Sequence, residues 1–188
     1  MTNESQELLN DARDQLNLVL GFFSRVDAKA SVVLAINTGM LAVLASNAPP
    51  LHKMSALAGV AAVFTVLIIA ASLWFLYRIA FPSLSGGHRS LIYFREMAQR
   101  TESTFIDEFT QQNHQARAKD VLGQVWRNSE ILKQKFDALK VAFILMAIAI
   151  FPWVVAVAMF SAVSADTKSL LQQGDGSFDP DFAGLHRQ

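Results

Sequence analysis

Three long stretches of this chain contain no aspartate, glutamate, lysine or arginine: residues 30–52, 54–77 and 141–165. All 16 basic and 16 acidic residues therefore lie outside them. An apolar helix of about 20 residues can cross the roughly 30 Å hydrocarbon core of a bilayer, whereas buried helices of soluble proteins are usually shorter. The pattern predicts an all-α membrane protein with three transmembrane helices. We place these helices at residues 30–48, 54–79 and 141–163.

The distribution of basic residues predicts the orientation of the chain, because lysine and arginine are retained on the cytoplasmic side of a membrane. Residues 1–29 contain three of them and residues 78–140 contain ten, whereas the short loop around Lys53 contains one and residues 164–188 contain two. We therefore expect a cytoplasmic amphipathic helix at residues 1–29 and a cytoplasmic helical region at residues 80–140. The C-terminal residues 164–188 should form a flexible tail on the other side of the membrane.

Apolar residues recur at alternating steps of three and four in both cytoplasmic parts, which indicates helices with one packed face. The first series comprises Leu9, Ala12, Leu16, Val19, Phe23, Val26 and Ala30. The second comprises Ala118, Leu122, Val125, Ser129, Leu132, Phe136, Leu139 and Phe143. We expect each series to lie on a helix that continues without a break into the membrane. The N-terminal helix and the segment between spans two and three should pack together as a cytoplasmic helical bundle.

The sequence contains no pattern typical of a catalytic or metal site. Its four histidines are scattered and have no cysteine partner, and neither a Gly-x-Gly-x-x-Gly nor a Walker sequence occurs. Pro82 and Ser85-Gly86-Gly87 are most simply interpreted as the end of the second span's helix. We therefore expect no enzymatic activity, no metal and no cofactor.

Polar residues inside the first span need an explanation, because an amide in a membrane requires a partner in protein or in a wet cavity. Asn37 and Thr38 lie near the middle of this span, and Ala35 and Gly39 have the four-residue spacing that allows close helix approach. Two interpretations stay open. Asn37, Thr38 and Gly39 form a structural contact between helices, or they line a pore or contact another copy of the chain.

Charged and amide residues gather near the cytoplasmic ends of the spans. A small anionic ligand requires cationic groups for a phosphate, amides for the edge of a base and an aromatic ring for stacking. The candidates for ligand contact are Arg25, Asp27, Lys29, Arg95, Gln124, Asn128 and Lys135. Solvated helix faces and membrane anchors explain most of the same residues, so this interpretation also stays open.

Two segments resemble the Pycsar effector transmembrane family (PycTM). They are Phe22-Phe23-Ser24-Arg25-Val26-Asp27-Ala28-Lys29-Ala30 and the helix containing Asp120, Gln124, Asn128, Ile131, Lys135 and Phe136. The resemblance covers about residues 8–160, including the proline after the second span. It implies an antiphage effector of the bacterial inner membrane, activated by cyclic CMP or cyclic UMP from a neighbouring pyrimidine nucleotide cyclase. Loss of membrane integrity would then stop the infected cell before phage spread, as abortive infection.

The expected mechanism is a change in helix packing when the cyclic nucleotide binds. Converting a 1:99 equilibrium to 99:1 requires about 5.5 kcal/mol of differential binding, more than the roughly 1.5–3 kcal/mol of one charge-assisted hydrogen bond. We therefore expect several contacts or several ligands on a homo-oligomer. The lipid bilayer and the cyclic pyrimidine mononucleotide are the other expected partners, and nucleic acid is not one. The alternatives are a membrane-anchored structural or interaction subunit and a small ion-channel component.

Overall fold

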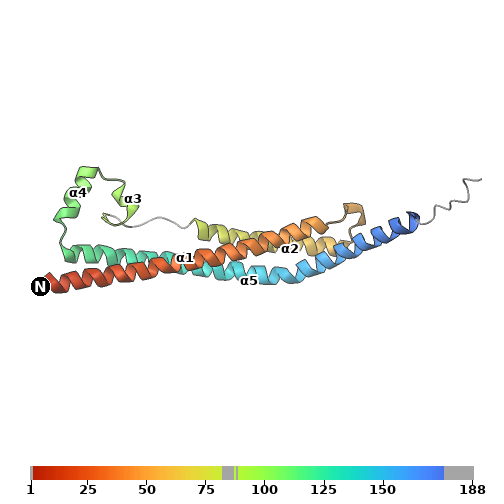
Figure 1. Cartoon of the computed structure of the whole chain (residues 1–188), viewed down its shortest axis with the longest axis horizontal. Helices are drawn as coiled ribbons and strands as arrows, with labels where there is room; N and C mark the ends of the chain where they lie inside the picture. Colours follow the sequence, from red (N-terminus) through yellow and green to blue (C-terminus); the bar gives the residue numbers. More distant parts are fainter. Residues whose placement is uncertain (1, 82–86, 88, 176–188) are drawn as a thin grey trace, which may run out of the picture. The chain divides into compact units, whose positions relative to one another are not determined.

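The computed structural model of the protein describes residues 2–81, 87 and 89–175. This part of the chain is helical and contains no strand (Figure 1). Its elements are α1 (Thr2–Asn47), a short 3-10 helix (Leu51–Lys53), α2 (Ala56–Ala80), α3 (Phe94–Met97), α4 (Glu102–Gln111) and α5 (His114–Asp175). Helices α1, α2 and α5 are each long and apolar enough to cross a membrane, so the predicted all-α class with three candidate spans is confirmed.

Helices α1 and α5 are unbroken over 46 and 62 residues, as Figure 1 shows. Each therefore continues from a charged segment into an apolar one, which confirms the prediction of continuous helices. Helix α5 extends to Asp175, twelve residues beyond the predicted end of the third span at residue 163. The positions at which the three helices enter a bilayer, and the side on which each segment lies, stay predictions.

Local sequence explains where the helices begin and end. Helix α1 ends just before Pro49-Pro50, because the residue before a proline is disfavoured in the α conformation. The Thr101 hydroxyl accepts a hydrogen bond from the Thr104 amide at the start of α4, and the Asn113 side chain accepts one from the Ala116 amide at the start of α5. Both side chains satisfy amides that have no partner within the helix.

The predicted helix terminator after the second span lies only partly within the described residues. Helix α2 ends at Ala80, and Pro82 and residues 85–86 lie outside the described part of the chain. Gly87 has a φ of 90°, in the left-handed region that favours glycine. A Cβ atom at this position would lie 2.7 Å from Cδ1 of Tyr93, so the backbone requires glycine here.

The chain divides into two compact units, and α1, α2 and α5 contribute to both. The first unit consists of Met1–Leu34 and Leu73–Phe143, and the second consists of Ala35–Ser72 and Ile144–Gln188. In the first unit a hydrophobic cluster joins α1 to α5 through Leu9, Ala12, Ala118 and Val121. The two alanines are small, so they allow the two helices to approach closely.

The predicted packed face is confirmed on α1 and only in part on α5. On α1, Leu9, Ala12, Val19 and Val26 are buried. On α5, Leu122 and Phe143 of the predicted series are 42% and 55% exposed. The buried face of α5 in the first unit contains Ala118 and Leu139 of the predicted series, together with Val121, Gln124, Lys135 and Ala142. The predicted series of apolar residues identified only part of this face, because Gln124 and Lys135 are polar residues at buried positions.

Arg100 fixes the connection that contains α3 and α4. Its Nε atom donates to the Glu108 carboxylate over 2.8 Å, and Nη1 donates to the Glu96 carbonyl over 2.7 Å. Its Nη2 atom donates to the Arg89 carbonyl over 3.1 Å. One guanidinium therefore ties the backbone before α3 to the side chain of α4, within the first unit.

The second unit contains an apolar cluster and, among its described residues, three buried polar side chains. Leu44, Ala58, Ala61, Ala156 and Phe160 form its hydrophobic cluster. The indole Nε1 of Trp153 donates to the Met40 carbonyl over 2.9 Å, which joins α5 to α1. The buried polar residues of this unit are Asn37, Thr65 and Ser72.

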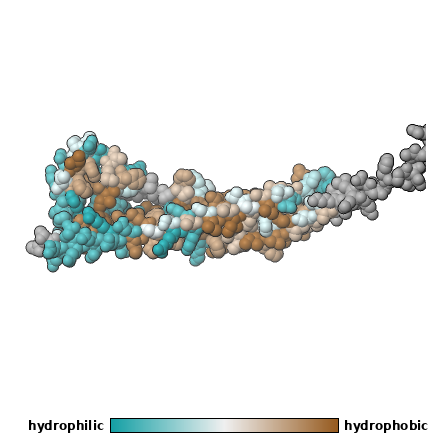
Figure 2. Space-filling model, viewed as in Figure 1, coloured by the Kyte–Doolittle hydropathy of each residue, from teal (hydrophilic) through white to brown (hydrophobic). Residues whose placement is uncertain are grey.

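Large apolar side chains face outward along α2. They include Leu57, Val60, Val63, Phe64, Leu67 and Trp74, each more than half exposed. Figure 2 shows hydrophobic surface over α2 and hydrophilic surface over the N-terminal part of α1. An apolar surface of this extent is unfavourable in water and is typical of a face that contacts lipid. The protein is therefore a membrane protein.

We expect Leu9→Ala to weaken the packing of α1 on α5 by about 2 to 5 kcal/mol, the usual cost of a large-to-small change in a core. Hydrogen–deuterium exchange should then become faster across residues 114–125 of α5. The matched control is Leu8→Ala, since Leu8 is 44% exposed whereas Leu9 is 1% exposed. Equal exchange in the two variants would contradict this packing.

Candidate functional site

Lys135 of α5 is buried although it carries a charge. Its side chain is 9% exposed, and its ammonium Nζ donates to the Asp27 carboxylate of α1 over 2.9 Å. The ammonium also lies 5.3 Å from the centre of the Phe23 ring. A buried ammonium without an anion is strongly unfavourable, so the Asp27 contact permits Lys135 to face α1. The Asp27 side chain is 54% exposed, so water hydrates the carboxylate far more readily than the ammonium.

The helix register places these residues together. Phe23 and Asp27 are four residues apart and therefore share one face of α1. Gln124 and Lys135 are eleven residues apart, about three turns, so they share the buried face of α5. Each polar residue on that face has a partner, because the Gln124 amide donates to the Ser90 hydroxyl over 2.9 Å. Hydrogen bonding explains why these two positions need no apolar side chain.

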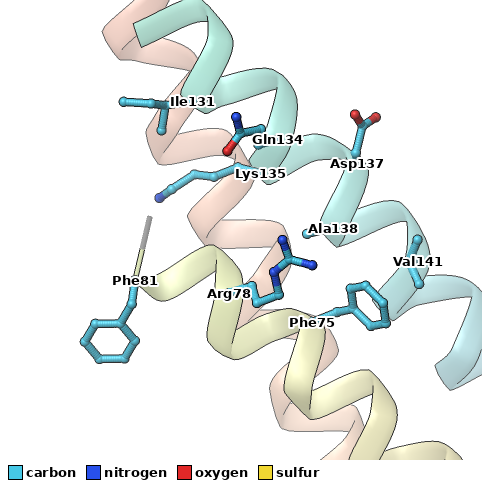
Figure 3. A pocket seen from close by; sticks show the side chains of 9 residues that line it. All are labelled: Phe75, Arg78, Phe81, Ile131, Gln134, Lys135, Asp137, Ala138 and Val141. Carbon is cyan, nitrogen blue, oxygen red and sulfur yellow. The ribbon is translucent and has the colours of Figure 1, made fainter. Parts of the chain in front are cut away.

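A cavity of about 490 Å³ lies beside Lys135, between the end of α2 and the facing part of α5 (Figure 3). Its residues recur at three- and four-residue steps, so each helix contributes one face. Its volume falls within the roughly 300–1,000 Å³ of small-molecule sites. The lining comprises Phe75, Arg78 and Phe81 at the end of α2, and Ile131, Gln134, Lys135, Asp137, Ala138 and Val141 on α5.

The polar groups of this cavity could bind an anion that also has a hydroxyl group. Figure 3 shows the Arg78 side chain reaching from α2 towards α5, near Ala138. Arg78 and Gln134 are exposed and make no hydrogen bond or ion pair with any other described residue. A guanidinium can bind phosphate through two parallel hydrogen bonds, and an ammonium adds a second positive charge. Asp137 also lines the cavity and can accept a hydrogen bond from a hydroxyl group.

A second, smaller hollow shares Lys135 with the cavity. It has a volume of about 240 Å³ and includes Asp27, Ala30, Ser31 and Leu34 of α1, together with Leu76, Ile79 and Ala80 of α2. Lys135 therefore lies between two hollows, and its carboxylate partner borders one of them. An anion that enters the larger cavity would meet Lys135, whose ammonium is already paired with Asp27 at the smaller hollow.

The seven residues predicted for ligand contact do not form a single site. The structure brings Asp27 and Lys135 together, and only Lys135 of the seven lines the larger cavity. Gln124 binds Ser90, as described above. Asn128 donates to the Gln124 carbonyl over 2.9 Å within α5, which leaves its side chain on its own helix.

The three remaining candidates are exposed and lie outside both hollows. The Arg25 guanidinium lies 5.0 Å from the centre of the Phe22 ring on the same helix. Lys29 and Arg95 line neither hollow. A role for Arg25, Lys29 or Arg95 in ligand contact stays a prediction.

Sequence reasoning missed Arg78, Gln134 and Asp137. In the sequence Arg78 is one of the ten basic residues of 78–140 that predict the orientation of the chain, and a basic residue after a span is commonly a membrane anchor. Its spacing of three residues from Phe75 placed a cation and a ring on one face of α2, but nothing in the sequence identified the facing helix. Gln134 and Asp137 are exposed residues of α5 outside the predicted apolar series, so nothing in the sequence connected them with Arg78.

The polar residues of the first span lie in the second unit. Asn37 is fully buried, and its Nδ2 donates to the Ser72 hydroxyl of α2 over 2.8 Å. Its Oδ1 atom has no hydrogen-bond partner among the described residues. Thr38 and Gly39 are exposed, and a Cβ at Gly39 would meet no atom of another described element within 4 Å. Asn37 thus makes a contact between helices, whereas a pore or a contact between copies stays a prediction.

We expect Asp27 and Lys135 to be energetically coupled. In a double-mutant cycle with Asp27→Asn and Lys135→Gln, the coupling should be about 1 to 2 kcal/mol, reduced from the value of a fully buried pair because Asp27 is half exposed. The measurement is unfolding of the purified protein by sodium dodecyl sulfate. Lys29→Gln replaces Asp27→Asn in the control cycle and should show no coupling to Lys135. A coupling of zero for Asp27 would mean that the pair does not stabilise the fold.

Comparison with known proteins identifies the family. The chain matches the family model of PycTM, described as the Pycsar effector protein domain, over residues 11–162. Neither the curated proteins nor the solved structures gave a match. The matched region contains α2, α3, α4, most of α1 and α5, and every residue that lines the two hollows. The chain therefore belongs to the Pycsar effector transmembrane family and has a Pycsar-associated effector role in antiviral defence.

Proposed function

We propose that the protein impairs the inner membrane of a phage-infected bacterium when a cyclic pyrimidine mononucleotide binds to it. The observation that supports this function most directly is the family match over residues 11–162. The activating ligand is cyclic CMP or cyclic UMP, made by a neighbouring pyrimidine nucleotide cyclase. The protein itself is not an enzyme in this proposal and needs no further cofactor.

The proposed orientation places residues 1–29 and 78–140 in the cytoplasm and residues 164–188 in the periplasm. Thirteen basic residues on the first side against three on the other support it. Arg78 and Lys135 would then meet a nucleotide made in the cytoplasm. The net charge of the chain is zero, so it offers no excess of positive charge for nucleic acid.

The continuity of α1 and α5 supports a mechanism based on helix packing. Both helices contain residues of the charged segments and of the apolar spans without a break. A ligand that changes the contacts of these helices in the first unit changes helices that also form the spans. The roughly 5.5 kcal/mol required for nearly complete switching exceeds one polar contact, so several contacts act together or several copies respond as an oligomer.

We expect the purified protein to release a trapped dye from liposomes only when a cyclic pyrimidine nucleotide is added. The liposomes contain phosphatidylethanolamine and phosphatidylglycerol, and cyclic CMP, cyclic UMP and cyclic AMP are added separately. Protein-free liposomes control for effects of the nucleotides on lipid. Release should follow cyclic CMP or cyclic UMP and should not follow cyclic AMP.

Other results would contradict the proposal in distinguishable ways. Equal release with and without nucleotide would show a membrane protein that no messenger activates. An ion-selective current without dye release would favour the ion-channel component. Absence of any permeability, together with stable capture of a soluble partner, would favour the interaction subunit.

A further inference from the structure

We propose that the cavity between the end of α2 and α5 binds the cyclic nucleotide, and that its phosphate displaces Asp27 from Lys135. This inference rests on the proposed function and adds two statements to it: where the ligand binds and which contact in the protein changes. The residues involved all belong to the first unit.

The cations of the cavity are suited to one phosphate group. Arg78 has a positive charge and no partner among the described residues, and it points into the space between α2 and α5 (Figure 3). Lys135 lines the same cavity and its side chain is only 9% exposed, and a low local dielectric strengthens its attraction for an anion. The phosphodiester of a cyclic nucleotide has one negative charge that two cations can share. In Figure 3 the Lys135 ammonium and the Arg78 guanidinium point in different directions, so joint binding requires the exposed Arg78 side chain to turn towards Lys135.

The remaining lining suits a ring with a polar edge. Phe75, Ile131 and Val141 supply apolar surface, and Phe81 supplies an exposed ring beside the cavity. The Gln134 amide both donates and accepts hydrogen bonds, as does the edge of a pyrimidine. Asp137 can accept a hydrogen bond from the remaining ribose hydroxyl, although its charge also disfavours an anion that lies too close.

The exposures of the ion pair explain why an anion could exchange with Asp27. If the pair separates, the half-exposed Asp27 carboxylate can be hydrated at small cost. Lys135 is 9% exposed and cannot be hydrated in the same way, so it requires another anion. A phosphate entering from the cavity would satisfy this requirement and free the aspartate.

The exchange changes which helices are connected. In the structure Lys135 joins α5 to α1 through Asp27. With phosphate bound between Arg78 and Lys135, the ligand would join α5 to α2 and the ion pair to α1 would be absent. The contact therefore moves from one helix pair to another where the charged segments meet the spans, which is the change in packing that the proposed function needs.

The decisive variant is Arg78→Gln, because Arg78 is exposed and its loss removes no hydrogen bond or ion pair between described residues. Isothermal titration calorimetry measures binding of cyclic CMP and cyclic UMP to the full chain in phosphatidylcholine nanodiscs. Arg78→Gln should weaken the affinity about tenfold or more, the effect of one charge-assisted hydrogen bond. Arg78→Lys should recover part of that loss, since it keeps the charge without the planar fork.

Asp27→Asn tests the competition separately. This variant removes the anion that competes for Lys135, so nucleotide affinity should rise about tenfold and dye release should begin at lower nucleotide concentration. The control for both variants is Lys133→Gln, which replaces an exposed lysine of α5 that does not line the cavity. Its affinity should equal that of the wild type.

The outcomes separate this inference from the proposed function. If the wild type neither binds a cyclic nucleotide nor releases dye, the proposed function fails and this inference fails with it. If the wild type responds and Arg78→Gln and Lys133→Gln bind equally well, this site is wrong and the proposed function stands. An unchanged affinity in Asp27→Asn would overturn the exchange.

A lipid phosphate is the other source of the same chemistry. The titrations are repeated with phosphatidylglycerol in the nanodiscs, and with inorganic phosphate in place of the nucleotide. A nucleotide affinity that depends on Arg78 in both lipids, and exceeds that of inorganic phosphate, supports the inference. If Arg78 affects only phosphatidylglycerol binding, the cavity binds a lipid headgroup and the inference is overturned.

Discussion

A largely buried lysine is stable only beside a negative charge, and this requirement fixes which face of α1 lies against Lys135 of α5 in the first unit. Lys135 satisfies it through Asp27, and the residues around the pair are arranged accordingly. The buried face of α5 passes through Lys135, so Phe136 on the next position turns outward. The aliphatic contacts of Leu9 with Ala118 and Val121 then continue the same face towards the start of α5.

This ion pair also connects the fold with the proposed function. A hydrophobic contact in the same place would stabilise the two helices without responding to a charged ligand. An ion pair with one exposed partner can be exchanged for another anion, and the neighbouring cavity with Arg78 offers a place for it. Membership of an effector family and helices that continue into the spans make a ligand-dependent change in packing the simplest common explanation.

The helical fold was predictable from the sequence, whereas the site was predictable only in part. The charge-free stretches indicated the candidate spans, because charged residues are unfavourable in a bilayer. The alternating steps of three and four indicated the packed face of α1, because they follow from helix geometry. The packed face of α5 was predicted only in part, because Gln124 and Lys135 are buried through specific partners, Ser90 and Asp27, that are far away in the sequence. Arg78 was missed because a basic residue after a span also serves as an anchor.

The chain contains no cysteine, so two introduced cysteines can be labelled without background. The most direct measurement of the central claim places spin labels at Lys29→Cys on α1 and Lys133→Cys on α5, both exposed positions in the first unit. Pulsed electron paramagnetic resonance then gives the distance between the two helices. The account predicts that the cyclic nucleotide which causes dye release changes this distance, and that Arg78→Gln prevents the change. An unchanged distance under conditions that release the dye would contradict it.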